Sequence, residues 1–82
     1  MKRPFTKYTL LHVIMYEAMW FLSDDINSEE GQKDLNDSTE RIIFSYGKEL
    51  LSEVFGVNKE SIEGHIRSLL VISKANQTKK TK

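Results

Sequence analysis

The chain has 82 residues, no cysteine, and 12 basic and 12 acidic side chains, so its formal net charge is zero. This length allows one small domain and excludes a multi-domain enzyme. The lack of cysteine excludes disulfide cross-links, thiolate nucleophiles and cysteine-based zinc sites, and the zero net charge argues against nucleic-acid binding through bulk electrostatics.

The first predicted element is a helix from about Thr6 to Leu22, preceded by Pro4. Its apolar residues spread well beyond one stripe, so we expect other elements to cover it on two sides. His12 and Glu17 interrupt the apolar stretch, which is also shorter than the roughly 20 residues that a bilayer span requires. Neither a signal peptide nor membrane insertion is therefore expected, and the cysteine-free composition favours a cytoplasmic protein.

The segment 24–37 is acidic, with six acids and Gly31. This composition predicts a solvated loop with room for one short helix. Asp25, Asn27 and Glu29 alternate like the first three ligands of an EF-hand calcium loop, but Gly31 comes one position too late for the obligatory glycine of that loop. We therefore expect no metal site here.

A second helix is predicted over about 39–55, after a capping box formed by Asp37 and Glu40. Gly47 lies inside it and disfavours helix by about 1 kcal/mol relative to alanine, so the helix is expected to break or to pack closely there. Gly56 is suited to the left-handed conformation that ends many helices, so it is the predicted C-terminal boundary.

A third helix is predicted over about 59–72, with Asn58 as its cap. Residues 75–82 contain no large apolar side chain and are expected to be disordered, so the single folded domain covers 1–74. No alternating run predicts a strand, and the fold class is therefore all-α, a compact bundle of three main helices. Trp20 should join or border the predicted core, which consists of Leu11, Ile14, Ala18, Phe21, Phe44, Leu51, Val54, Phe55, Ile62 and Ile66.

Catalytic motifs are missing from the sequence. It has no glycine-rich phosphate loop, no Gly-x-Ser-x-Gly elbow and no His-Glu-x-x-His pair. His12 and His65 stand far apart, and the apolar surroundings of His12 favour a structural position. We expect neither an enzyme nor a cofactor or small-molecule substrate.

The segment 48–70 has the parts of a helix-turn-helix: a helix, a turn at Gly56 with Val57 directed inward, and a second helix after Asn58. It resembles the helix-turn-helix of LuxR-type and sigma-factor-like DNA-binding domains. The residues that carry this resemblance are Asn58, Ser61, Ile62, His65, Ile66, Leu69 and Leu70.

The resemblance implies a small transcriptional regulator that binds DNA as a homodimer. Ser52 departs from the alanine usual at its position, and Glu60 and Glu63 place negative charge on the expected DNA-facing helix. The basic residues expected to contact phosphate are Lys48, Lys79, Lys80 and Lys82. The residues expected to face the major groove are Asn58, Lys59, Ser61, Gly64, Arg67 and Ser68.

In size, apolar first helix, acidic middle and lysine-rich end, the whole chain also resembles accessory proteins of T-even-like phages, including the cytoplasmic lysis-inhibition antiholin. That resemblance implies a non-enzymatic inhibitor that binds another protein, for example a holin. Met15, Met19 and Trp20 are the candidate anchors, because methionine adapts to irregular surfaces and tryptophan is frequent at binding hot spots. The alternative interpretation places the same three residues in the core or in a homodimer interface.

Overall fold

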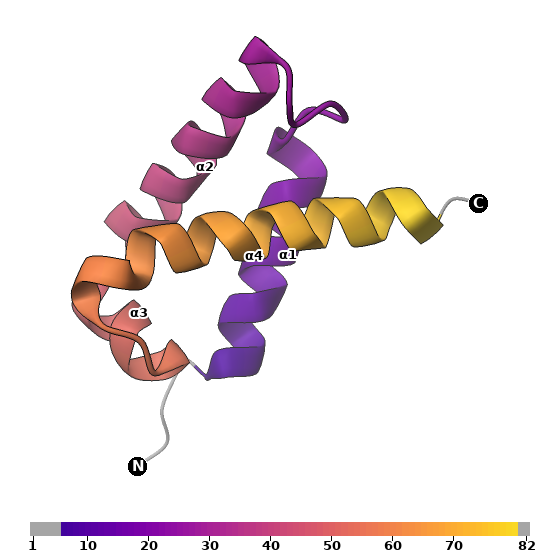
Figure 1. The fold of residues 1–82 in the computed structure, drawn as a ribbon. Helices are drawn as coiled ribbons and strands as arrows, with labels where there is room; N and C mark the ends of the chain where they lie inside the picture. Colours follow the sequence, from indigo (N-terminus) through magenta and orange to yellow (C-terminus); the bar gives the residue numbers. More distant parts are fainter. Residues whose placement is uncertain (1–5, 81–82) are drawn as a thin grey trace.

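The computed structural model describes residues 6–80, with side chains described as far as Gln77. Within these residues it is all-α, as the sequence predicts, and contains no strand. There are four helices rather than three: α1 (Lys7–Phe21), α2 (Glu29–Tyr46), α3 (Lys48–Phe55) and α4 (Lys59–Lys80) (Figure 1).

Helix α4 organises the fold. It runs across α1 in Figure 1, with α2 and the short α3 on the side of its N-terminal half, and it packs against all three other helices. Its most extensive contact is with α1. The first and last helices of the described chain therefore form the centre of the domain.

Ten apolar side chains form the buried core: nine come from the four helices, and the tenth is Leu22, which directly follows α1. Five predicted core residues are confirmed, Ile14, Ala18, Leu51, Ile62 and Ile66, while Val54 and Phe55 are half-buried and pack against the core. The other members, which were not among the predicted core residues, are Leu10, Leu22, Leu35, Ile42 and Leu70.

Three aromatic residues assigned to the core or its border are exposed instead: Trp20 is 73%, Phe21 54% and Phe44 92% exposed. The buried row of α1 runs through Leu10, Ile14 and Ala18 at intervals of four residues, and Trp20 follows Ala18 by two residues. Two residues correspond to about 200° around a helix, so Trp20 faces away from the row. Phe44 follows buried Ile42 by the same interval. Leu11, another predicted core residue, is only half-buried.

Helix α1 has nearly the predicted bounds. The hydroxyl of Thr6 caps it by accepting a hydrogen bond from the Thr9 backbone amide at 3.2 Å. At the other end, the Leu22 amide donates to the Ala18 carbonyl at 3.3 Å. The expectation that other elements cover this helix on two sides is wrong, because only the side with Leu10, Ile14 and Ala18 is buried.

Helix α2 begins at Glu29, in the segment where the sequence allows one short helix. It is long instead and continues to Tyr46, so the prediction of a solvated loop is wrong from Glu29 onward. Ser28 is its cap and accepts a hydrogen bond from the Gly31 amide at 2.9 Å, while Asp37, the predicted cap, lies inside the helix. Two glutamates in the first turn favour this start because they interact with the positive end of the helix dipole. Gly31 is buried against the loop, where an added Cβ would overlap the Asp25 carbonyl oxygen.

The predicted helix over 39–55 is divided at Gly47, which has a φ of 89° and ends α2. Its amide donates to the Ile43 carbonyl at 2.7 Å, and its carbonyl accepts from the Leu51 amide at 3.1 Å. Gly56 ends α3 in the left-handed conformation with a φ of 71°, as predicted. The chain therefore turns at both glycines, because both positions require a positive φ.

Helix α4 continues to Lys80 instead of ending near residue 72, and the segment 75–80 of the predicted tail is helical. The Gln77 side-chain amide donates to the Met15 carbonyl at 3.1 Å, and Lys74 forms an ion pair with Asp24 at 3.3 Å. Polar contacts hold this end of the helix, so the pattern of apolar residues does not predict it. Residue Lys82 and the rest of the predicted tail beyond Lys80 lie outside the described residues.

Candidate binding surfaces

The outward side of α1 carries an exposed stripe that contains no Asp, Glu, Lys or Arg. Its members lie three or four residues apart, which places them on one side of a helix. Trp20 and Tyr8 are the most exposed, at 73% and 78%. We call this stripe the α1 face, and it consists of Tyr8, His12, Tyr16, Met19 and Trp20.

Aromatic rings and one histidine follow each other along the α1 face. The Nδ1 atom of His12 lies 3.1 Å from the Tyr8 carbonyl oxygen, and its ring centroid lies 6.4 Å from that of Tyr16. Met19 is 43% exposed. Of the three candidate anchors, Met19 and Trp20 therefore belong to this face, whereas Met15 is half-buried where α4 approaches α1.

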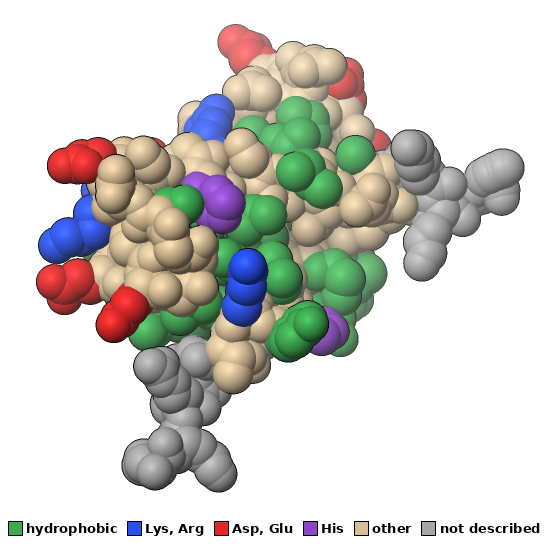
Figure 2. All heavy atoms as spheres, turned by 60° about the horizontal axis from the view of Figure 1, so that its bottom comes forward, with side chains coloured by type: hydrophobic (Ala, Val, Ile, Leu, Met, Phe, Trp, Pro, Cys, Tyr) green, Lys and Arg blue, Asp and Glu red, His purple; other side chains and the backbone are tan. Residues whose placement is uncertain are grey.

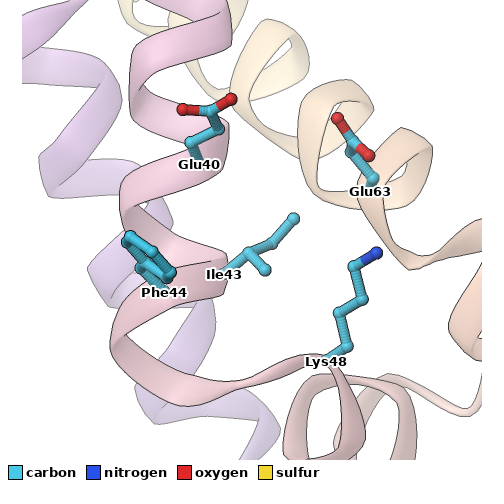
Figure 3. Close-up of a pocket in the computed structure, with 5 residues that line it drawn as sticks. All are labelled: Glu40, Ile43, Phe44, Lys48 and Glu63. Atoms are coloured by element: carbon cyan, nitrogen blue, oxygen red, sulfur yellow. The ribbon is translucent and has the colours of Figure 1, made fainter.

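A second surface feature is a pocket of about 320 Å³ between α2, the start of α3 and α4. Figure 3 shows Ile43 pointing into the space between α2 and α4, with Phe44 beside it on α2. Glu40 and Glu63 lie at one end of the pocket, and Lys48 extends into it from α3 with its amine directed toward Glu63. We call this site the Phe44 pocket.

The Phe44 pocket was not predicted from the sequence, because the apolar spacing of the helix places Phe44 in the core. The positions of the charged residues along α2 show which side of the helix faces the solvent, and they could have corrected the assignment of Phe44. Lys33, Asp37 and Glu40 are exposed and recur at helical spacing, and Phe44 continues that outward row. Apolar side chains also reach the surface elsewhere: in Figure 2 they spread over much of the face that carries α3 and the start of α1, with acidic side chains toward its edge.

The segment 48–70, predicted to form a helix-turn-helix, contains α3, a three-residue turn over 56–58, and the first part of α4. The Gly56 and Val57 amides both donate to the Ser52 carbonyl, at 2.8 and 3.1 Å. Val57 packs half-buried against the core, which is the inward direction expected from the sequence. Asn58 precedes α4, and its carbonyl accepts from the Ser61 amide at 2.9 Å.

The predicted DNA-facing residues do not all share one face of α4. Ser61, Gly64 and Ser68 lie exposed on one outward row, whereas Arg67 turns toward α2. The Arg67 guanidinium donates to the Asn36 side chain and, at 3.3 Å, to Gln32.

The cations expected to assist DNA binding are also dispersed. Lys59 at the start of α4 pairs with Glu49 at 3.4 Å, and Lys48 lies in the Phe44 pocket. Lys79 and Lys80 occupy the last turn of α4, about 30 Å from its start by the rise of an α-helix, and their side chains lie outside the described part. The structure therefore brings only some of the residues predicted to contact DNA together on one surface.

Among residues 6–80, no group of three or more His, Cys, Asp or Glu side chains is placed to hold a metal ion. His12 lies on α1 and His65 on α4, where the His65 ring centroid is 5.4 Å from that of Phe55. No helix in this described range combines the length and apolar character needed to cross a membrane.

Comparison of the chain with protein-family models, curated proteins and solved structures found no match in any of the three.

Proposed function

We propose that this is a non-enzymatic regulatory protein that acts by binding another protein through the α1 face. The observation that carries the proposal is the 73% exposure of Trp20 within an uncharged stripe. Tryptophan, tyrosine and methionine are enriched in protein interfaces, and tryptophan and tyrosine dominate their hot spots. Burying such a side chain contributes roughly 1.5–3 kcal/mol, so the stripe offers a large free-energy gain to a partner that covers it.

The chemistry of the α1 face fits an apolar or amphipathic helix, because a stripe without formal charges makes no demand for ion pairs. This mode of action is that of the cytoplasmic lysis-inhibition antiholins that the chain resembles, which act on a holin. The cysteine-free composition supports a cytoplasmic location for such an inhibitor.

The experiment is co-expression of the chain with the holin of a T-even-like phage in host cells, following the time of lysis. We expect the chain to delay lysis and Trp20→Ala to abolish the delay. Ile72→Ala is the matched control, since Ile72 is also exposed but lies on α4. Circular dichroism of each purified variant shows whether the fold is intact. Lysis at the usual time with the unaltered chain would refute the antiholin proposal.

A second candidate function, sequence-specific DNA binding, is supported by the turn over 56–58. A left-handed Gly56, an inward Val57 and an outward row of Ser61, Gly64 and Ser68 on the following helix match the parts of a helix-turn-helix. A homodimer would be needed, because one helix with balanced charges gives weak affinity and two half-sites multiply it.

The measurement for this candidate is gel retardation of genomic DNA fragments at low salt. Binding should weaken in Lys59→Ala, because Lys59 is an exposed cation at the start of α4. It should also fall steeply as salt rises, because phosphate contacts release counterions. If no fragment is retarded at low salt, the chain does not bind DNA.

A further inference from the structure

We propose that the Phe44 pocket receives an apolar side chain from a cationic amphipathic helix of the partner protein. This inference rests on the proposed protein-binding function and adds a second contact surface, with its own chemistry, to the α1 face. The two surfaces belong to different elements: the α1 face lies on one helix, and the pocket is formed by α2, α3 and α4.

The apolar part of the pocket is suited to one anchoring side chain. Ile43 is half-buried and packs against the core, so it forms a fixed apolar floor. Phe44 is 92% exposed and stands beside the opening (Figure 3). A volume of about 320 Å³ lies at the lower limit of small-molecule sites, which is the size for an anchor residue rather than for a large ligand.

The charged part of the pocket identifies the partner as cationic. Glu40 and Glu63 come from different helices and lie at the same end, where Lys48 balances one of the two charges (Figure 3). A lysine or arginine beside the anchor residue would therefore find a carboxylate on either side of it. An anionic helix would meet both glutamates and be repelled, so the sign of the charge distinguishes the occupants.

The outer surface of α2 extends this negative character beyond the pocket. Glu29, Glu30 and Asp37 are exposed on the same helix, where Lys33 opposes them, and Arg41 is paired with Glu17. A helix laid along α2 would thus need cations in several turns to match it. A second copy of this chain lacks that match in its α1 face, which contains neither lysine nor arginine.

The test uses the full chain and a fluorescent 18-residue peptide, with leucine at helical spacing on one side and lysine elsewhere, titrated by anisotropy at physiological salt. The comparison peptide replaces every lysine with glutamate. We expect binding of the lysine peptide alone. Phe44→Ala and Glu63→Lys should each weaken it roughly tenfold, which corresponds to about 1.4 kcal/mol. Both side chains are exposed, so these variants should keep the fold.

The matched control is Glu53→Lys, which makes the same charge change at an exposed glutamate of α3 outside the pocket. An unchanged affinity in this control supports the proposal. Equal weakening by Glu53→Lys and Glu63→Lys would overturn it, because binding would then follow net charge. Equal binding of the two peptides, or no binding of the lysine peptide, would also overturn it.

Two further outcomes separate this inference from the proposed function. If Trp20→Ala weakens peptide binding and Phe44→Ala does not, the peptide occupies the α1 face and the pocket proposal fails while the proposed function stands. If Phe44→Ala instead abolishes self-association in sedimentation and peptide binding is unchanged, a second copy occupies the pocket. Failure of the lysis experiment with normal peptide binding would count against the antiholin function alone.

Discussion

The guanidinium carbon of Arg41 lies 4.6 Å from the centroid of the Phe21 ring, and the same guanidinium pairs with Glu17. Phe21 and Glu17 lie four residues apart on α1, so one arginine of α2 spans a full turn of the first helix. Phe21 directly follows Trp20, so these two contacts of Arg41 connect α2 to the part of α1 next to the α1 face.

Replacing Arg41 with alanine should lower the free energy of unfolding by about 1 kcal/mol. Cation–π contacts at exposed sites contribute about 0.5–1 kcal/mol, and surface ion pairs contribute about 0–1 kcal/mol. Urea unfolding measures the loss. A double-mutant cycle with Phe21→Leu isolates the ring contact, and additive effects in that cycle would show that Arg41 and Phe21 do not interact.

Gly31→Ala should destabilise the protein by more than 2 kcal/mol. An added Cβ would overlap the Asp25 carbonyl oxygen and lie 2.8 Å from the Ile26 Cα atom, and backbone atoms cannot move aside as a flexible side chain can. Thermal unfolding followed by circular dichroism measures the change. A variant as stable as the unaltered protein would mean that α2 does not touch the preceding loop at this point.

Gly64→Ala should have the opposite effect and stabilise the protein by about 0.5–1 kcal/mol. Gly64 is a solvent-exposed residue within α4. Apart from its two chain neighbours and the nearby backbone of its own helix, no atom lies within 4 Å of the position of an added Cβ. Alanine therefore gains helix propensity without a clash. The same thermal measurement applies, and a loss of stability would show that the outward row of α4 is covered in solution.

Trp20→Ala should change the free energy of unfolding by less than about 0.5 kcal/mol, as expected of a surface substitution. Leu51→Ala should lower the free energy of unfolding by about 2–5 kcal/mol, because Leu51 is completely buried and its truncation leaves a cavity.

Tryptophan fluorescence measures the environment of Trp20 directly, since Trp20 is the only tryptophan in the sequence. Emission typical of a buried indole in the unbound monomer would contradict the exposed position.

The sequence predicts elements best where apolar periodicity and capping residues agree. The α1 bounds, the turn at Gly56 and the start of α4 after Asn58 follow from such signals. The sequence does not predict which side of α1 is buried, because apolar side chains lie on every side of this helix and several sides could face the core. Packing against α4 decides among them, and the choice leaves Trp20 outside.

The continuity of α2 from residue 29 to residue 46 was missed for a different reason, which is that small polar residues cover part of its buried side. Ser38 and Thr39 are buried, and the Thr39 hydroxyl donates to the Leu35 carbonyl at 2.8 Å within the helix. A pattern based on apolar residues therefore finds Leu35 and Ile42 as isolated positions. The Phe44 pocket was missed for a separate reason: Glu40, Ile43 and Phe44 lie in the part of α2 that the sequence does predict as helix, but Phe44 was assigned to the core.

The pairing of α1 with α4 also governs when the chain can fold during its synthesis. Leu10, Ile14 and Ala18 leave the ribosome before α4, the helix that covers them most extensively. The core of this domain can therefore be completed only after α4 has been made, so its four helices fold as one unit. Until α4 has been made, the apolar side chains on both sides of α1 are exposed to chaperones, and a protein that bound the aromatic side at this stage would bind a chain without its core.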